Sequence, residues 1–188
     1  MFWEYGLWTE QLIGIELTLK ECKWVKGVAI EYFNLKNQSG PIYHDSDQMI
    51  PDQISCDDNN YNNKLYNGWF NYGMIIGTPL VTSPIYNSSH RIRSENNRVE
   101  AFHLGIEGQP FRSIGYRVLL TKSNNWGSYD LPFLQIKENL SGLFELSYTP
   151  AKLKGWSATA SFAFDNGDLY SDNSGAMLTV RKSGIINF

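Results

Sequence analysis

The sequence has few cysteines, no excess of basic residues and no long apolar run, and each absence excludes a class of protein. Cys22 and Cys56 are the only cysteines, too few for a disulfide scaffold or for a zinc site with paired ligands. The 16 basic and 19 acidic residues give a net charge of −3, so no basic face for nucleic acid is expected. No segment approaches the ~20 consecutive apolar residues of a membrane-spanning helix.

The N-terminus lacks a signal peptide, because Met1 is followed by Phe2, Trp3, Glu4 and Tyr5 rather than by a basic start and an apolar stretch. Membrane-spanning β-strands are still permitted, since only every second residue of such a strand is apolar. A barrel in the outer membrane needs a leader for export. If the chain belongs to such a barrel, we expect it to be a fragment whose upstream part is missing.

Aromatic residues and alternating segments are abundant. The chain holds 11 Tyr, 10 Phe and 6 Trp, and seven segments alternate between apolar and small or polar side chains, which is the period of a β-strand. In 114–121 the apolar face is formed by Ile114, Tyr116 and Val118, and Arg117 lies on the other face. The other six segments lie near 13–19, 27–32, 98–107, 140–148, 156–165 and 176–188.

The two faces of these segments differ in kind. One face carries mid-strand charges, namely Glu16, Glu31, Glu107, Arg117, Glu145 and Arg181. The other is apolar for nearly its whole length, with aromatics near the ends at Tyr32, Tyr148, Trp156, Phe164 and Phe188. This pattern is typical of a lipid band with aromatic girdles around a polar lumen. We therefore expect an all-β fold, part of an antiparallel transmembrane β-barrel with about seven strands, while a soluble β-sandwich or barrel remains the alternative.

The lengths of the connections support the same topology. Segments 20–26, 108–113 and 149–155 are short, whereas 36–97, 123–139 and 166–175 are longer, as expected for periplasmic turns and outer loops. We expect one barrel segment over 1–188, with residues 37–97 as a long extracellular loop or plug. The strand-like stretch 69–76 is placed outside the wall.

This topology makes two further predictions. Cys22 falls in a periplasmic turn and Cys56 in an outer loop, so the two lie on opposite sides of the bilayer. Seven strands do not give the even number of a bacterial barrel, and an open edge in lipid leaves backbone groups unpaired. The remaining strands are therefore expected to come from elsewhere.

The C-terminus offers a weak motif. Phe188 is terminal and Ile186 precedes it by two residues, which looks like the signal that barrel-assembly machinery recognises. Arg181 fits the polar position of that signal, but Ser183 stands where glycine is preferred. A chance apolar terminus is the alternative interpretation.

A larger resemblance is to the capsule-assembly Wzi family in its Bacteroides-type form, and it extends from about residue 7 to about residue 184. The blocks that carry it are 38–45 (QSGPIYHD), 57–63 (DDNNYNN), 65–69 (LYNGW), 73–80 (GMIIGTPL), 83–87 (SPIYN), 97–99 (NRV), 103–105 (HLG), 123–129 (SNNWGSY), 165–169 (DNGDL) and 172–173 (DN). The blocks are individually unspecific, but their order and spacing are fairly specific.

The resemblance implies an outer-membrane β-barrel with an outer-side plug that acts as a lectin-like anchor for capsular polysaccharide. Family members are much longer than this chain, which is similar to their C-terminal part. The family supplies no matched catalytic residues, so no enzyme activity and no cofactor are expected. The implied partners are capsular polysaccharide, outer-membrane lipid and, through Phe188, the barrel-assembly machinery.

The acidic residues Asp57 and Asp58, with Asp45 and Asp47 nearby, raise two hypotheses, a calcium site and a pair of catalytic carboxylates. A calcium loop needs a tight glycine turn among closely spaced oxygen ligands, and no glycine lies between Gly40 and Gly68. A glycosidase pair needs one carboxyl group in an apolar pocket. Solvated loop acids are the simpler interpretation, and no metal site is expected.

The loops do combine aromatic rings with amides and charges, the residue types that contact sugars by apolar stacking and a few fixed hydrogen bonds. Packing inside a plug or girdle is the alternative role for each ring, and solvation is the alternative for the arginines. The glycan-binding candidates are Tyr61, Tyr66, Trp69, Tyr72, Trp126, Tyr129, Asp57, Asp58, Arg91 and Arg93.

Three functional hypotheses follow. The first is an outer-membrane barrel that anchors or helps to assemble capsular polysaccharide at the cell surface by non-covalent binding. The second is a soluble β-rich glycan hydrolase domain that uses Asp57 or Asp58, and the third is a general porin.

Overall fold

A computed structural model of the chain describes residues 10–38, 42–44, 48–49, 54–55, 59–62, 69–87 and 91–184. Several residues singled out above lie outside this part of the chain, namely Asp45, Asp47, Cys56, Asp57, Asp58, Tyr66 and Phe188. No helix in the described ranges is long and apolar enough to cross a membrane.

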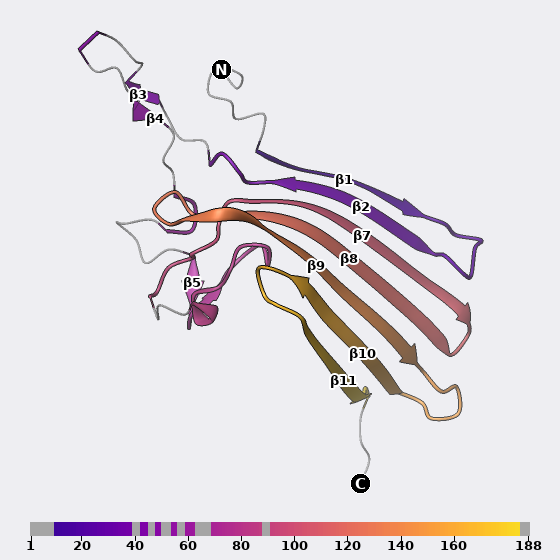
Figure 1. Ribbon diagram of the computed structural model, residues 1–188. Coiled ribbons are helices and arrows are strands. Elements are labelled where there is room, and N and C mark those ends of the chain that lie inside the picture. Colours follow the sequence, from indigo (N-terminus) through magenta and orange to yellow (C-terminus); the bar gives the residue numbers. More distant parts are fainter. Residues whose placement is uncertain are drawn as a thin grey trace. The chain divides into compact units, whose positions relative to one another are not determined.

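The dominant element is a seven-stranded antiparallel sheet (Figure 1), as expected from the alternating segments. Its order is β1-β2-β7-β8-β9-β10-β11. The strands are β1 (Gln11–Thr18), β2 (Gly27–Asn34), β7 (Val99–Phe111), β8 (Ile114–Gly127), β9 (Pro132–Tyr148), β10 (Trp156–Gly167) and β11 (Asn173–Lys182). Each of the seven predicted segments contributes one strand. The sheet is open, because β1 and β11 each have one neighbour among the described strands.

The remaining elements are small and belong to the excursion between β2 and β7. β3 (Ile42–His44) pairs with β4 (Ile54–Ser55), β5 (Phe70–Asn71) pairs with β6 (Met74–Ile75), and a short 3-10 helix covers Pro84–Tyr86. The strand-like stretch 69–76 is therefore a separate hairpin. Its placement outside the main sheet is confirmed.

The expected lengths of two connections are wrong. β8 continues to Gly127 and β9 begins at Pro132, so the link is only 128–131 rather than 123–139. β10 and β11 are joined by 168–172 rather than by 166–175. The polar residues of 123–127 suggested a loop, but they continue the strand. The N–H of Trp126 donates to the Arg98 carbonyl over 3.0 Å, and Nδ2 of Asn125 donates to Oγ of Ser123 and to the Lys137 carbonyl. The regular alternation of short and long connections is not present.

Register explains why one face of the sheet is largely apolar. Phe162 lies opposite Phe144 on β9 and Ala176 on β11, and the next pairs along the same face are Ala160 with Leu146 and with Leu178. On the other face Ser161 lies opposite Glu145. Because side chains alternate along every strand, this register collects the apolar residues of three strands on one side.

The contacts divide the chain into two units. The sheet unit comprises Gly14–Glu31, Phe102–Lys122 and Glu138–Phe188, and the polar unit comprises Met1–Ile13, Tyr32–Ala101 and Ser123–Lys137. Among the described residues the buried apolar side chains are those of Val81, Val99 and Ala101, all in the polar unit. The sheet unit therefore lacks a hydrophobic core of its own in the described part of the chain.

Gly142 on β9 gives a test of the packing on the apolar face. A Cβ atom placed there would lie 2.3 Å from Cε1 of Phe164, whereas a Cβ atom at Gly175 on β11 would meet nothing within 4 Å. We expect Gly142→Ala to lower the free energy of unfolding by about 1 kcal/mol or more, because the ring has to move. Gly175→Ala is expected to be neutral or to stabilise by about 0.5 kcal/mol, because alanine loses less backbone entropy.

The measurement is a urea titration of both variants followed by tryptophan fluorescence. Equal effects of the two alanines would show that Phe164 does not cover Gly142.

Candidate functional site

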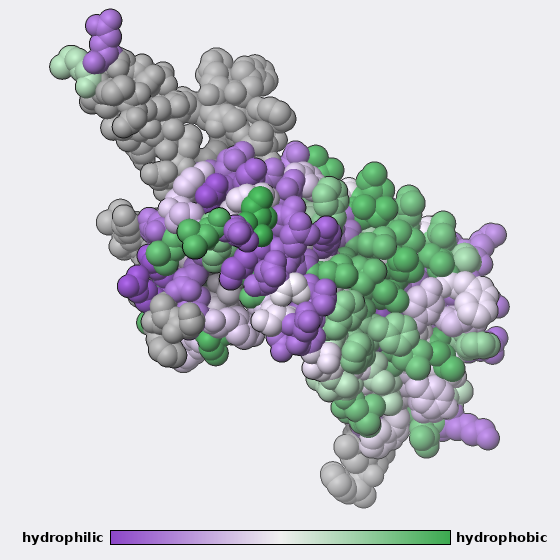
Figure 2. Space-filling model, viewed as in Figure 1, coloured by the Kyte–Doolittle hydropathy of each residue, from purple (hydrophilic) through white to green (hydrophobic). Residues whose placement is uncertain are grey.

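The apolar face of the sheet unit is exposed. Phe144, Leu146 and Phe162 are 47%, 44% and 48% exposed, and Leu178 and Val180 on β11 are 72% and 61% exposed. Ile15 and Leu17 on β1 are also exposed, and Figure 2 shows apolar side chains gathered over the sheet. Soluble monomers rarely expose contiguous apolar patches beyond a few hundred Å², and larger ones mark protein or membrane contacts. This face therefore needs a covering layer.

The opposite face is polar and internally bonded. Nε of Arg117 donates to Oε2 of Glu145 over 2.7 Å, and Oγ of Ser161 donates to Oε1 of the same carboxylate over 3.0 Å. His103 Nδ1 lies 2.6 Å from Oγ1 of Thr121. Of the charges predicted to share one face, Arg117 on β8 and Glu145 on β9 are thus brought together, and Ser161 on β10 bonds to the same carboxylate. Arg117 is half exposed, so its ion pair contributes about 1 kcal/mol at most.

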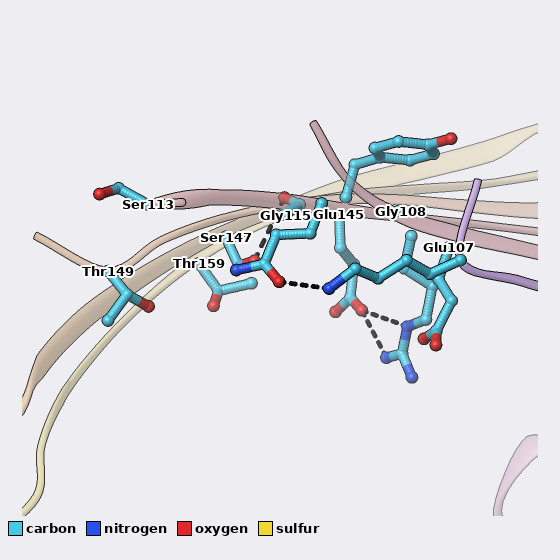
Figure 3. A pocket seen from close by; sticks show the side chains of 12 residues that line it. Glu107, Gly108, Ser113, Gly115, Glu145, Ser147, Thr149 and Thr159 are labelled. Atoms are coloured by element: carbon cyan, nitrogen blue, oxygen red, sulfur yellow. Dashed lines mark hydrogen bonds and ion pairs between the residues drawn. The ribbon is translucent and has the colours of Figure 1, made fainter. Parts of the chain in front are cut away.

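A hollow of about 500 Å³ opens on this polar face. Figure 3 shows Glu107, Glu145, Thr149 and Thr159 on one side of the strands, where their oxygen atoms reach the hollow. Lys26 also lines it and donates from Nζ to Oε1 of Gln109 over 2.7 Å. The hollow presents hydroxyl groups and charges of both signs, a lining suited to water and polar solutes rather than to apolar ligands.

The polar unit is organised by buried amide side chains. Gln38, Asn97 and Asn125 are completely buried, and Asn96 is nearly so. Asn96 Nδ2 donates to Oδ1 of Asn125 over 2.9 Å, while Nδ2 of Asn125 donates to the Lys137 carbonyl over 3.0 Å. Buried polar groups of this kind must be hydrogen-bonded to be tolerated. The interior of this unit is therefore specified by hydrogen bonds rather than by apolar packing.

The same network fixes the described part of the loop at 59–62. Asn97 Nδ2 donates to the Asn60 carbonyl over 2.6 Å, and Nε2 of Gln38 donates to the Asn97 carbonyl over 2.9 Å. Asn62 Nδ2 donates to the Ser94 carbonyl over 2.7 Å. Chain segments far apart in sequence are joined by these bonds. They hold Tyr61, one of the glycan-binding candidates, in a defined position.

Two aromatic candidates lie together and one lies apart. Tyr61 and Trp69 line one hollow of about 490 Å³ within the polar unit. Tyr72 occupies the turn between β5 and β6, is 97% exposed and does not line that hollow. Its φ of +48° and the φ of +78° at Gly73 are those of a tight hairpin turn.

Trp126 and Tyr129 have packing partners. Nζ of Lys36 lies 4.7 Å from the centroid of the Trp126 ring, and the guanidinium of Arg98 lies 4.2 Å from that of Tyr129. The Tyr129 hydroxyl also donates to the Asn37 carbonyl over 2.5 Å. One face of each ring is therefore covered by a cation, which leaves less of it for a ligand.

The two arginine candidates lie on the same chain segment but have different surroundings. Arg93 forms an ion pair with Asp130 at 3.6 Å, whereas Arg91 is exposed. Tyr66, Asp57 and Asp58 lie outside the described residues. Their assignment to glycan binding remains a prediction, as it does for the seven candidates that the structure describes.

Phe33 and Leu35 were not singled out from the sequence, yet they line the hollow with Tyr61 and Trp69. The available signal is a break in alternation, because these two apolar residues follow Ala29 and Glu31 on the polar face of β2. Asn60, Ile76 and Gly77 are the other described residues of the lining. Nothing in the sequence pattern links these three residues to the end of β2.

Metal ligands and thiols give no further site. In the described ranges no group of three or more His, Cys, Asp or Glu side chains is placed to hold a metal ion. Cys22 is a free, exposed thiol, and the prediction that Cys56 lies across the bilayer from it is not tested. No protein-family model, curated protein or solved structure matches the chain.

Asn125 tests the buried network. We expect Asn125→Ala to lower the free energy of unfolding by about 2 kcal/mol, because the Asn96 amide and the Lys137 carbonyl lose their partner in a buried site. Asn124→Ala is the control, since Oδ1 of Asn124 has no hydrogen-bond partner and is buried. That variant is expected to be neutral or slightly stabilising. Urea unfolding of both variants provides the comparison, and a neutral Asn125→Ala would contradict a structural role for the network.

Proposed function

We propose that this chain forms part of the wall of an outer-membrane β-barrel that holds capsular polysaccharide at the cell surface by non-covalent contacts. The observation that carries the barrel is the combination of one exposed apolar face and one polar, hydrogen-bonded face on a seven-stranded sheet. Hydrocarbon would cover the first face and water the second, which is the arrangement of a barrel wall.

The dimensions of the strands support a bilayer. A membrane-crossing β-strand needs about 9–11 residues when tilted. β7, β8, β9, β10 and β11 have 13, 14, 17, 12 and 10 residues, and β1 and β2 have 8 each. Five strands are long enough to cross and two are slightly short.

A second packed sheet is the competing cover for the apolar face. Among the described residues the only strands outside the main sheet are those of β3, β4, β5 and β6, each two or three residues long. Such strands are too small to cover the apolar residues of seven strands. Lipid is therefore the favoured partner of this face.

Closure of the barrel determines whether the number of further strands is odd or even. β1 and β11 run in the same direction, because six antiparallel steps separate them in the sheet. Unpaired strand edges in hydrocarbon cost several kcal/mol for each backbone group. An antiparallel barrel would therefore be closed by an odd number of further strands. The resulting total is even, as in bacterial barrels.

The polysaccharide part of the proposal is supported by the resemblance of the sequence blocks to the capsule-assembly Wzi family and by the aromatic hollow of the polar unit. Assembly machinery that recognises Phe188 is the proposed partner for insertion. A general porin is the second candidate function, favoured by the polar hollow beside Arg117 and Glu145.

Paired substitutions on β11 test the membrane placement. Leu178 lies on the apolar face opposite Ala160, and Thr179 lies on the polar face opposite Thr159. In a bilayer we expect Leu178→Arg to destabilise the folded state by about 2–4 kcal/mol, because a charge then faces hydrocarbon, and Thr179→Arg to have little effect.

The measurement is the folded fraction of each variant after refolding into lipid vesicles, read from heat-modifiable migration on a gel. The chain is refolded together with the strands that close its barrel. Equal folding of both arginine variants would refute the bilayer placement, because an exposed leucine in water tolerates arginine.

Deletion of the gene tests the capsular role. We expect the deletion strain to synthesise capsular polysaccharide but to release it into the medium, so that the cell-bound fraction falls several-fold. Sedimentation of cells and chemical assay of polysaccharide in the pellet and supernatant measure this. An unchanged distribution, together with slower uptake of small hydrophilic solutes, would favour the porin.

A further inference from the structure

The hollow in the polar unit has the size and lining of a small-molecule site. It measures about 490 Å³ and is lined by Phe33, Leu35, Asn60, Tyr61, Trp69, Ile76 and Gly77. Ligand pockets typically measure ~300–1,000 Å³ and combine apolar walls with a few fixed polar groups. Of the seven glycan-binding candidates that the structure describes, Tyr61 and Trp69 line it.

The walls offer aromatic surface that the rest of the unit does not cover. Trp69 is 65% exposed and Ile76 is 53% exposed, while Phe33 and Tyr61 are partly buried. The described buried residues of this unit are mainly amides and serines, with Val81, Val99 and Ala101 as the apolar ones. A ligand with an apolar face would remove the side chains of Trp69 and Ile76 from water.

Three residues of the lining carry polar side-chain groups with hydrogen-bonding capacity left. Within the described part of the chain, the side-chain amide of Asn60, the hydroxyl of Tyr61 and the indole N–H of Trp69 have no hydrogen-bond partner. A purely aliphatic ligand would bury these groups unpaired, at a cost of about 1–3 kcal/mol each. The lining therefore favours a ligand that has hydroxyl groups beside an apolar face.

The backbone that carries these groups is fixed before any ligand binds. The amide N–H of Asn60 donates to Oε1 of Gln38 over 3.0 Å, and its carbonyl accepts from Asn97. Tyr61 has a φ of +69°, an uncommon conformation that the flanking bonds at Asn60 and Asn62 hold. The Trp69 carbonyl accepts from the N–H of Ile76 over 2.8 Å. Preorganisation of this kind reduces the entropy lost on binding.

The described lining of the hollow is uncharged, which favours a neutral ligand. Among the described residues that line the hollow there is no Lys, Arg, Asp or Glu, so none of these residues offers a charged partner to an anionic or a cationic group.

We propose that this hollow is the subsite that binds a neutral sugar residue of the polysaccharide, with the ring face against Trp69 and the hydroxyls toward Asn60 and Tyr61. The inference rests on the proposed function and names the part of the ligand that is recognised. A neutral sugar unites flat apolar faces and hydroxyl groups, which are the two features that the lining matches.

The test compares Trp69→Ala with Tyr72→Ala, its matched control. Tyr72 is an exposed aromatic in the adjacent hairpin and lies outside the hollow. The chain, refolded together with the strands that close its barrel, is run through gels containing neutral glucans, galactomannans or mannans as probes, and retardation is measured. We expect retardation by at least one of these, weakened about tenfold or more by Trp69→Ala, as for a central aromatic contact, and unchanged by Tyr72→Ala.

Two further variants separate binding from folding. Trp69→Phe keeps a flat ring and is expected to restore part of the affinity, whereas Tyr61→Phe removes only the hydroxyl and is expected to weaken binding by a smaller factor than Trp69→Ala. Heat-modifiable migration of every variant reports barrel assembly independently of sugar binding. Loss of affinity accompanied by loss of assembly in all Trp69 variants would overturn the subsite, because the side chain would then be structural.

The remaining outcomes separate the subsite from the wider proposal. Full binding by Trp69→Ala, or no retardation of the wild-type protein by any neutral polysaccharide, overturns the subsite. Normal assembly in the same experiment would leave the barrel proposal standing. Retardation only in gels of acidic polysaccharide, unaffected by Trp69→Ala, would place recognition at charged residues and would also overturn it.

Discussion

The stability of the sheet unit depends on what covers its exposed apolar face. Residues such as Phe144, Phe162 and Leu178 share one side of the sheet through register and remain largely exposed. If this face were exposed to water, folding of the sheet would lose the free energy of apolar burial, which is roughly 25 cal/mol for each Å² removed from water. A hydrocarbon environment removes the penalty without any second layer of protein. This energetic requirement of the sheet is the physical support for the bilayer proposal.

The polar face of the sheet is stable in the same environment, provided that water reaches it. Arg117 and Glu145 bond to each other and to Ser161, but Arg117 stays half exposed. Charges in this position are stable when water reaches them and expensive when it does not. A sheet with hydrocarbon on one side and water on the other satisfies both faces at once. A soluble sandwich also solvates its polar face, so the cover of the apolar face is the feature that distinguishes the two.

The polar unit reaches a defined structure by a different route. Its buried residues are mainly amides and hydroxyls, and Asn96, Asn97 and Asn125 each bond to groups far away in the sequence. Hydrogen bonds are directional, so such a network specifies the loop positions more narrowly than apolar packing would. That precision is what a binding surface requires. It holds Asn60 and Tyr61 beside the ring of Trp69 with their polar groups still available.

The sequence by itself determined the seven strands, their order along the chain and the division of side chains between two faces, because alternation is a local property of each strand. The placement of 69–76 outside the main sheet was also predicted, but its hairpin form was not. Only the tertiary structure decided the lengths of β8 and β9, since the end of β8 bonds to residues outside that strand: the Trp126 N–H to the Arg98 carbonyl and Nδ2 of Asn125 to the Lys137 carbonyl. The tertiary structure alone also places Phe33 in the same hollow as Tyr61 and Trp69. It places Lys36 over the ring of Trp126 and Arg98 over the ring of Tyr129. Such contacts depend on where long-range hydrogen bonds place each loop, and no local pattern records that placement.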